Sequence, residues 1–387
     1  MKIGIDARMF GPAVGGGGLG RYVEQLVDQL QKQDLENRYV LFLKRENFDT
    51  CVIVNPNFEK RLADVHWYTA KEQIVMPFLI AREGLDLIHF PHWNVPLLCR
   101  TPFVVTIHDL ILLEQPVSSK TTTRGPVVHW LKRLGYRISL RHAIGASKRV
   151  VAVSRYTKSS IARFFPRINS SKVEVVYEGV TGLVPSTLDD PHRTMTSPRP
   201  SPFKGEGGKP YVLYVGNAYP HKNLDSLLDA FAIFSESHPD VELVLAGRDD
   251  LFYKRLRSSV DDAANVRFVM NPTDAELAEL YRGAALYVFP SKSEGFGLPP
   301  LEAMSAGIPV VSSNATCLPE ILGDAALYFP PDDVEAMATA MERGYSDERF
   351  RAELIAKGRE QVKTYSWAAM ARSILNLYGN VAHRETE

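Results

Sequence analysis

A pair of carboxylates in the second half of the chain has the spacing and surroundings of a ligand site. The segment EGFGLPPLE runs from Glu294 to Glu302 and follows the apolar run LYVFP at 286–290. Ligands of open parallel sheets bind at the carboxyl ends of strands, so Glu294 stands where a ligand is expected. Carboxylates accept hydrogen bonds from paired hydroxyls, so one glutamate suits a sugar and the other a ribose diol. Taken alone, the two glutamates are also typical of solvated surface charge.

The residues between the two glutamates favour an anion beside them. Gly295 and Gly297 allow the backbone to approach a ligand closely. Pro299 and Pro300 are typical of a first helical turn, which places the start of a helix near Leu298. The N–H groups at a helix start carry a partial positive charge. The segment therefore predicts a diphosphate site bordered by carboxylates.

A glycine-rich loop in the first half, GPAVGGGGLG at 11–20, offers a second phosphate cradle. Gly15, Gly17 and Gly20 satisfy G-x-G-x-x-G, the spacing of dinucleotide-binding loops. They begin nine residues after Asp6, whereas the dinucleotide motif begins directly after its strand. A nicotinamide site is therefore disfavoured.

A histidine follows another apolar run, FVVTI at 103–107. His108 at this strand end can orient groups or transfer protons near neutral pH, although a lone histidine there is more often structural. Asp109, the next residue, is interpreted as a group that orients the loop.

Short β-branched runs alternate with helical patterns along the chain, which is typical of parallel sheets. The rhythm stops between Pro185 and Pro210, in a segment rich in Pro, Ser, Thr and Gly, and then restarts. We predict two doubly wound domains, a linker or disordered excursion between them, and helices from about Asp332 onward. Strands are expected at 2–5, 39–43, 87–90, 103–107 and 149–153, and then at 211–216, 241–247, 266–270, 286–290, 308–313 and 325–329.

Composition and targeting signals indicate a cytoplasmic protein with a large core. The 387 residues are 45% hydrophobic, the N-terminus lacks the pattern of a secretion signal, and no apolar run reaches the roughly 18 residues of a membrane span. Cys51, Cys99 and Cys317 are far apart and predict neither a disulfide framework nor a zinc site. Each cysteine is interpreted as a small buried hydrophobe.

The segments EGFGLPPLEAMSAGIPVVSS and YVGNAYPHKNLDSLLDAF resemble the donor domain of the retaining GT-B glycosyltransferases called glycosyl transferases group 1. The segments GIDAR, GGLGRY and VVTIHDL are similar to motifs of the first domain. The resemblance implies an α/β GT-B fold, with two Rossmann-like doubly wound domains facing a cleft and the last helix crossing back to the first domain. The expected parts are an acceptor-side domain at 1–185, the linker at 186–209, the donor domain at 210–365, and the C-terminal helix at 366–387.

The resemblance also implies roles for individual residues. Glu294 would contact the donor sugar, Glu302 the nucleotide ribose and Lys222 a phosphate, while His108 would lie beside the donor sugar. His108, Glu294 and Lys222 are thus the predicted catalytic residues. Related sequences often carry arginine where this chain has Asn217, and we expect Arg248 to supply the second phosphate cation. The other implied donor contacts are Gly18, Gly216, Asn217, Gly295, Phe296, Gly297 and Leu298.

The activity that the resemblance implies is transfer of a hexose from a nucleoside diphosphate sugar to a hydroxyl with anomeric retention. A GDP-mannose-like donor and a glycan or lipid-diphosphate acceptor in surface polysaccharide synthesis are the expected substrates. No cofactor is expected, and no metal either, because the chain has no D-x-D segment. A nucleotide-sugar epimerase of the same fold and a non-catalytic nucleotide-binding module are the alternatives.

Charge is unevenly distributed although the net charge is zero. Residues 1–185 hold 25 basic and 16 acidic side chains, while residues 210–387 hold 16 and 26. Most of the basic excess lies at 120–172, where there is no acidic residue. This run predicts either a polar helix face or a surface attracted to anionic lipid on the inner face of the membrane. Nucleic acid is disfavoured, because no binding module is recognisable and the pI is about 7.2.

Overall fold

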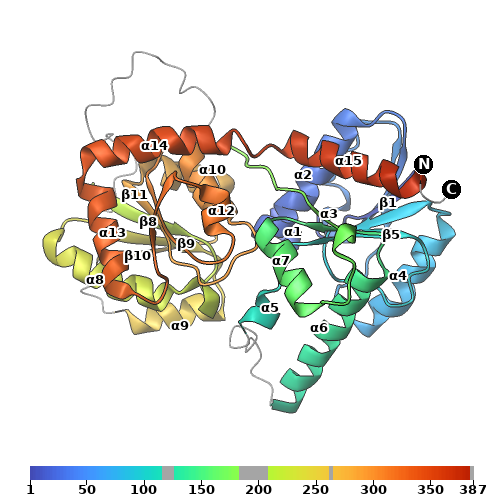
Figure 1. Cartoon of the computed structure of the whole chain (residues 1–387), viewed down its shortest axis with the longest axis horizontal. Coiled ribbons are helices and arrows are strands. Elements are labelled where there is room, and N and C mark those ends of the chain that lie inside the picture. The colour runs from blue at the N-terminus through green and yellow to red at the C-terminus, as the bar shows by residue number, and fades with distance from the viewer. Residues whose placement is uncertain (116–125, 183–207, 261–264, 384–387) are drawn as a thin grey trace. The chain divides into compact units, whose positions relative to one another are not determined.

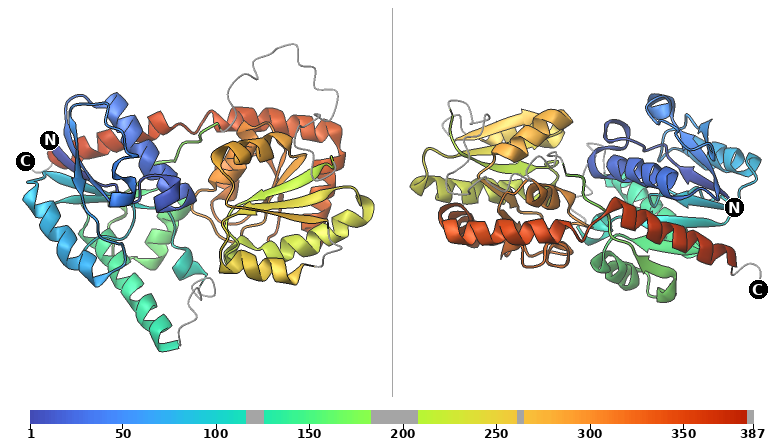
Figure 2. Two further views of the ribbon diagram at one scale, coloured as in Figure 1. Left: turned by 180° about the vertical axis from the view of Figure 1, so that it is seen from behind. Right: turned by 90° about the horizontal axis from the view of Figure 1, so that it is seen from above.

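The chain forms two compact α/β units in a computed structural model that describes residues 1–115, 126–182, 208–260 and 265–383. Unit 1 takes its described residues from Met1–Leu110, Ser119–Gly179 and Ser366–Glu387. Unit 2 takes them from Ile111–Ser118 and Val180–Tyr365. Each unit is a parallel sheet covered by helices on both faces (Figures 1 and 2).

The sheet of unit 1 has seven strands in the order β3-β2-β1-β4-β5-β6-β7. The order reverses between β1 and β4, and such a reversal opens a crevice at the carboxyl edge of a sheet. Its strands are β1 (Lys2–Asp6), β2 (Arg38–Leu43), β3 (Phe58–Leu62), β4 (Leu87–Phe90), β5 (Phe103–Ile107), β6 (Arg149–Ala152) and β7 (Val173–Val175). Its helices are α1 (Pro12–Gly15), α2 (Gly17–Gln33), α3 (Arg45–Phe48), α4 (Ala70–Arg82), α6 (Pro126–Ala146), α7 (Arg155–Phe164), the 3-10 turn η1 (Ser170–Lys172) and α15 (Trp367–His383).

The sheet of unit 2 has six strands in the order β10-β9-β8-β11-β12-β13, with the reversal between β8 and β11. Its strands are β8 (Tyr211–Val215), β9 (Glu242–Gly247), β10 (Val266–Met270), β11 (Leu286–Phe289), β12 (Val310–Ser313) and β13 (Ala326–Phe329). Its helices are α5 (Ile111–Glu114), the 3-10 turn η2 (Pro220–Lys222), α8 (Leu224–Ser237), α9 (Leu251–Ser259), α10 (Asp274–Gly283), α11 (Leu298–Ser305), α12 (Leu318–Leu322), α13 (Val334–Ser346) and α14 (Glu348–Val362).

Every strand predicted from an apolar run is present, and two strands are additional. These are β3, with the sequence FEKRL, and β7, with the sequence VEV; both are edge strands. Both strands are partly solvated and carry charged residues, so they lack the apolar run that predicts a buried strand.

The final helix belongs to unit 1, as predicted. The ring of Trp367 in α15 lies edge-on to Tyr22 of α2 at 6.4 Å, and the Gln33 side chain of α2 donates to the Ala368 carbonyl at 3.3 Å. The backbone N–H of Ala369 approaches the Ser366 hydroxyl at 3.4 Å, in agreement with the predicted Ser N-cap.

The unit boundaries differ from the predicted 1–185 and 210–365. Residues 111–115 belong to unit 2, where the Ser293 hydroxyl donates to the Glu114 carboxylate at 3.1 Å. Val180 also belongs to unit 2, and its N–H donates to the Tyr365 carbonyl. These changes of unit depend on contacts between residues distant in the sequence, which local patterns do not reveal. Residues 186–207 of the predicted linker lie outside the described residues. Among the residues described, no helix is long and apolar enough to cross a bilayer.

Candidate active site

The loop that follows β11 carries Glu294 and is held by the loop that follows β12. The backbone N–H of Glu294 donates to the Thr316 hydroxyl at 3.0 Å, and the Cys317 thiol lies 3.3 Å from the Glu294 carbonyl oxygen. Because β11 and β12 are parallel neighbours, both loops leave the sheet at the same carboxyl edge. Glu294 is only 8% exposed there, so it is not the solvated surface charge of the alternative interpretation.

The turn into α11 requires the predicted glycine. Gly297 has φ 93°, and a Cβ at this position would lie 2.9 Å from a methyl carbon of Leu318. Helix α11 starts at Leu298 with proline in its first turn, as predicted. The Phe296 ring is buried edge-on against Tyr365 at 5.4 Å, so this residue can offer a ligand only its backbone.

An ion pair joins two of the predicted catalytic residues. The Lys222 ammonium lies 2.5 Å from the Glu294 carboxylate, and both side chains are largely buried. Lys222 ends η2, where Asn223 in the left-handed conformation, φ 61°, donates its side-chain amide to the carbonyls of Pro290 and Pro331. The lysine is therefore held at the same carboxyl edge as the glutamate. The sequence predicted both residues but not their contact.

Glu302 lies on the buried side of α11. Its carboxylate accepts a hydrogen bond of 3.0 Å from the Tyr281 hydroxyl of α10. The residue is 6% exposed. The predicted ribose contact would thus come from a carboxylate that one phenol already orients.

The residues after β8 and β9 that are predicted to bind phosphate follow the carboxyl ends of two neighbouring parallel strands. The backbone N–H of Gly216 donates to the Ala246 carbonyl at 3.0 Å, and a Cβ on Gly247 would lie against the Gly216 carbonyl oxygen. Asn217 shapes the turn, because its carbonyl oxygen accepts from the Tyr214 hydroxyl at 2.8 Å. Arg248 follows Gly247 directly and is exposed, and its role as the second phosphate cation stays a prediction.

Two buried polar atoms near this edge have no partner within the described residues, and sequence reasoning missed both. They are Nδ1 of His221 and the hydroxyl oxygen of Ser291. Buried polar groups normally find a partner, so such atoms mark a place for a ligand group or an ordered water. Burial and the neighbouring Lys222 lower the pKa of His221 to about 4, which keeps the ring neutral. The direct adjacency of His221 to Lys222, the predicted phosphate contact, was the one available signal.

His108, in unit 1, is held by acceptors on both ring nitrogens. Nδ1 lies 2.8 Å from the Glu178 carboxylate, and Nε2 lies 2.9 Å from the Pro91 carbonyl. Both partners are acceptors, so the doubly protonated ring satisfies both contacts. Burial alone lowers the pKa of His108, but the hydrogen bond and charge of Glu178 outweigh it and raise the pKa above its ordinary value. Glu178 was not predicted from the sequence.

Replacing Glu178 by glutamine is expected to lower the pKa of His108. Because the folded-state pKa is raised, the interaction stabilises the fold fully below the unfolded pKa of about 6.5 and is lost as pH rises through the folded pKa. Glu178→Gln should therefore decrease the free energy of unfolding, relative to the wild type, more at acid pH than at alkaline pH. NMR titration of the imidazole C–H signals measures the pKa directly. Glu174→Gln on β7 is the matched control, and an equal His108 pKa in both variants contradicts the assignment.

Packing requires glycine at two positions of the glycine-rich loop of unit 1. A Cβ on Gly15 would meet the Met9 carbonyl, and a Cβ on Gly20 would meet the carbonyl oxygen of Gly11. Gly18 lies in the first turn of α2 and is exposed, so its predicted donor contact is sterically open. Gly18 and His108 belong to unit 1, and the other predicted site residues belong to unit 2.

The two parallel sheets, each with a reversal of strand order, have the architecture of the GT-B fold. Among solved structures, sucrose-phosphate synthase from Thermosynechococcus elongatus is 22% identical and superposes with a TM-score of 0.75 over 99% of this chain and 100% of that one. This likeness confirms the fold class predicted from the sequence.

The chain belongs to the glycosyl transferases group 1 family. The family model of that description matches residues 200–361, and a model described as glycosyltransferase family 4 matches residues 16–181. O-antigen chain mannosyltransferase B of Escherichia coli is 30% identical over 281 residues, which cover 71% of this chain and 69% of the relative. O-antigen chain mannosyltransferase RfbU of Salmonella typhimurium is 27% identical over 294 residues, which cover 75% and 74%.

Proposed function

We propose that this glycosyltransferase transfers mannose from a GDP-mannose-type donor to a hydroxyl of a glycan or lipid-linked acceptor, with retention of the anomeric configuration. The observation that carries the proposal is the Lys222–Glu294 pair at the carboxyl edge of the unit 2 sheet, beside the start of α11. The names of the two bacterial relatives support mannose and a surface polysaccharide.

The chemistry assigned to the site is a substitution at the anomeric carbon of the donor. The bond from that carbon to the diphosphate breaks, the bond to the acceptor oxygen forms on the same face, and the acceptor proton passes to the departing phosphate oxygen. Lys222, Arg248 and the backbone N–H of Leu298 at the start of α11 would stabilise the charge that develops on the diphosphate, since Pro299 and Pro300 have no N–H. These groups take the place of a metal ion, and no cofactor or enzyme nucleophile is assigned.

Glu294 would change partner when the donor binds. Without a ligand its carboxylate is occupied by Lys222. A diphosphate attracts the ammonium more strongly than one carboxylate does, because it carries more charge. Glu294 is then available to accept hydrogen bonds from sugar hydroxyls, while the unpartnered Nδ1 of neutral His221 can meet another hydroxyl.

The donor is tested by thermal stabilisation and turnover with a panel of GDP, UDP, ADP and dTDP sugars. A ligand specific for the folded state raises Tm by mass action, so GDP-mannose and GDP should give the largest shifts. Activity is expected to persist after chelation of divalent cations. An increase in Tm with UDP and no increase with GDP overturns the assignment of GDP as the donor nucleotide. An isomeric nucleotide sugar formed from the donor alone, seen by NMR, favours an epimerase instead.

We also propose that α6 docks on an anionic membrane surface. Leu134 and Ile138 are 40% and 50% exposed, and Arg137 and Arg141 are exposed on the same helical face. The adjoining Tyr136 is buried and anchors the opposite face of the helix. Apolar side chains flanked by cations suit a negatively charged bilayer interface. Residues 120–125 of the predicted basic run lie outside the described residues.

Replacing Leu134 and Ile138 together by aspartate is expected to abolish sedimentation with vesicles that contain phosphatidylglycerol. The change removes the apolar contact and adds repulsion from the anionic lipid. Ile233→Asp, at a residue of α8 that is 43% exposed, is the control and should leave sedimentation unchanged. Equal sedimentation of the wild type with neutral phosphatidylcholine vesicles contradicts an electrostatic surface.

A further inference from the structure

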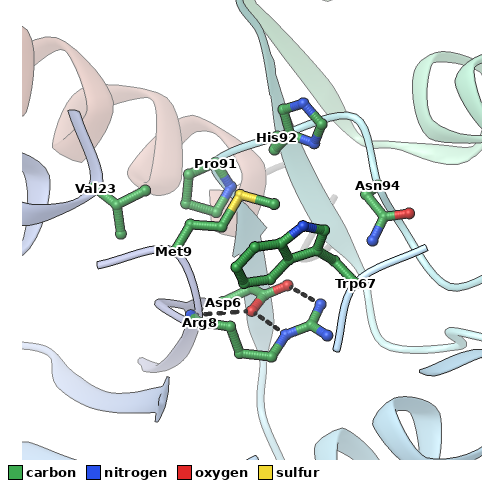
Figure 3. A pocket seen from close by; sticks show the side chains of 8 residues that line it. All are labelled: Asp6, Arg8, Met9, Val23, Trp67, Pro91, His92 and Asn94. Atoms are coloured by element: carbon green, nitrogen blue, oxygen red, sulfur yellow. Dashed lines mark hydrogen bonds and ion pairs between the residues drawn. The ribbon is translucent and has the colours of Figure 1, made fainter. Parts of the chain in front are cut away.

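A pocket with aromatic walls lies at the carboxyl edge of the unit 1 sheet, where the strand order reverses between β1 and β4 (Figure 3). Asp6 and Arg8 line it from the end of β1, and Trp67 lines it from the loop after β3. His92 and Asn94 line it from the loop after β4. Figure 3 shows the indole of Trp67 next to the ion pair of Asp6 and Arg8. The location is the one where open parallel sheets bind ligands.

A buried network of charged and polar side chains forms the base of this pocket. The Arg8 guanidinium is 2% exposed and bonds both carboxylate oxygens of Asp6, at 2.7 and 2.6 Å. Glu72 is completely buried and accepts from Arg8 and from the Asn94 amide, each at 2.6 Å. Burying three charges costs desolvation energy that apolar packing would avoid, so stability alone does not account for the network. Its rigidity suits a ligand site.

The same buried glutamate holds an exposed tyrosine in an unfavourable backbone conformation. Tyr68 has φ 62° and is 54% exposed, and its backbone N–H donates to the second Glu72 oxygen at 2.9 Å. A bulky residue with positive φ is a genuine outlier, and residues held this way cluster at ligand sites. Its ring stacks on Trp93 with centroids 5.1 Å apart and planes at 26°. The strain therefore presents an aromatic ring to solvent.

Tyr68 belongs to a set of aromatic rings around the pocket, which we call the aromatic platform. The rings of Tyr68, His92 and Trp93 contact one another, the His66 ring contacts Trp67, and Trp67 and His92 line the same pocket. Neighbouring rings lie 4.6 to 6.0 Å apart between centroids. Trp93 also packs edge-on against Tyr136 of α6 at 4.7 Å, which anchors the platform to the body of unit 1. The platform consists of His66, Trp67, Tyr68, His92 and Trp93.

The charges around the pocket favour a neutral, hydroxylated ligand. Asp6 and Glu72 together carry two negative charges and Arg8 one positive charge, so the base of the pocket has a surplus negative charge that repels phosphate. Burial lowers the pKa of His92 to about 3, so this ring adds no cation. Lys44, over the Trp67 ring at 4.9 Å, is paired with Glu46. Aromatic faces beside carboxylate and amide groups match a sugar ring, which has apolar C–H faces and a rim of hydroxyls.

We propose that the aromatic platform binds a neutral saccharide ring of the acceptor, an inference that rests on the proposed transfer function. The sugar ring stacks on Tyr68 and Trp67, and its hydroxyls reach the polar groups of Asp6 and Asn94. The platform thus selects acceptors by their terminal sugar rather than by a diphosphate. Neither the glutamate motif nor the predicted donor contacts include any platform residue.

Tyr68→Ala tests the platform in the full-length protein, with methyl α-mannoside, mannobiose and N-acetylglucosamine as probes. Saturable quenching of tryptophan fluorescence and saturation-transfer NMR report binding near Trp67 and Trp93. At least one probe should bind the wild type, and the affinity should fall about tenfold or more in the variant, in line with the loss of one stacked aromatic. Phe78→Ala, which removes an α4 ring that is 55% exposed, is the control and should bind as the wild type does.

A second substitution separates loss of contact from loss of folding. Glycine adopts positive φ without the steric cost that alanine has, so Tyr68→Gly should have a higher Tm than Tyr68→Ala while it binds saccharide no better. Unchanged binding in both variants overturns the proposal. Binding of none of the probes, or binding of pyrophosphate in their place, overturns it as well.

Donor assays distinguish failure of the platform from failure of the transfer function. Slow hydrolysis of GDP-mannose without acceptor and the Tm shift with GDP depend on the predicted catalytic residues and donor contacts, none of which is a platform residue. If both persist in Tyr68→Ala while saccharide binding is lost, the platform and the transfer function both stand. If both persist and the wild type binds no saccharide, the platform alone fails. If no nucleotide sugar is bound or hydrolysed by the wild type, the proposed function itself fails.

Discussion

Replacing Lys222 by alanine is expected to lower kcat/KM for the sugar donor by roughly 10²–10³, the range found when one preorganised donor to a developing anion is removed. The lysine ends η2 at the carboxyl edge of the unit 2 sheet, where its ammonium pairs with the Glu294 carboxylate. The diphosphate gains negative charge as the sugar leaves, so the loss should appear in kcat as well as in kcat/KM.

The control for this variant is a lysine paired with carboxylates elsewhere in unit 2. Lys357 of α14 pairs with Asp324 and Glu353, and Lys357→Ala should retain wild-type turnover. Removing Lys222 also leaves Glu294 buried without its partner, which costs about 1–3 kcal/mol of stability. Initial rates should therefore be measured well below the Tm of each variant. A Lys222→Ala enzyme with wild-type kcat contradicts the assignment of this residue to the leaving group.

The second large effect is expected at Glu294. Glutamine keeps the shape of the side chain but removes the charge that strengthens hydrogen bonds from sugar hydroxyls. Hydrogen bonds to charged groups contribute about 1.5–3 kcal/mol, so Glu294→Gln should lower kcat/KM about 10- to 100-fold, and Glu294→Ala should lower it further. Steady-state kinetics with GDP-mannose measures both. Glu353→Gln on the surface of α14 is the matched control.

A double-mutant cycle tests whether Glu294 acts on the sugar or only positions Lys222. If Glu294 merely holds the ammonium, its loss adds nothing once Lys222 is absent, and the double variant equals Lys222→Ala. Separate contacts to sugar and phosphate predict that the double variant is clearly less active than either single variant. A double variant as active as Lys222→Ala would falsify the sugar contact.

The sequence was sufficient to predict the strands with apolar runs, the turn into α11 and the family, because these depend on local patterns. The edge strands β3 and β7 were missed, since partial solvation permits sequences such as FEKRL and VEV. The assignment of chain segments to the two units was also only partly predictable. Helix α5 follows a unit 1 strand directly but belongs to unit 2.

Local sequence patterns could not predict the contacts within the candidate site, because these contacts depend on the strand order of each sheet. Lys222 and Glu294 are 72 residues apart, and they meet because β8 and β11 are neighbours in the sheet. His108 and Glu178 are 70 residues apart and follow β5 and β7, on either side of β6. Spacing in the sequence identifies residues whose types suit a chemistry. The strand order of the sheet decides which of those residues form an ion pair or a hydrogen bond.

The stereochemistry of donor hydrolysis tests the central claim most directly, because it needs no knowledge of the acceptor. GDP-mannose carries mannose in the α configuration, and water can replace the acceptor hydroxyl. Proton NMR during the first minutes of slow hydrolysis should show α-mannose appearing before mutarotation produces the β anomer. Lys222→Ala should give no signal above background. Initial release of β-mannose, or turnover of no nucleotide sugar at all, would contradict a retaining glycosyltransferase built on the Lys222–Glu294 site.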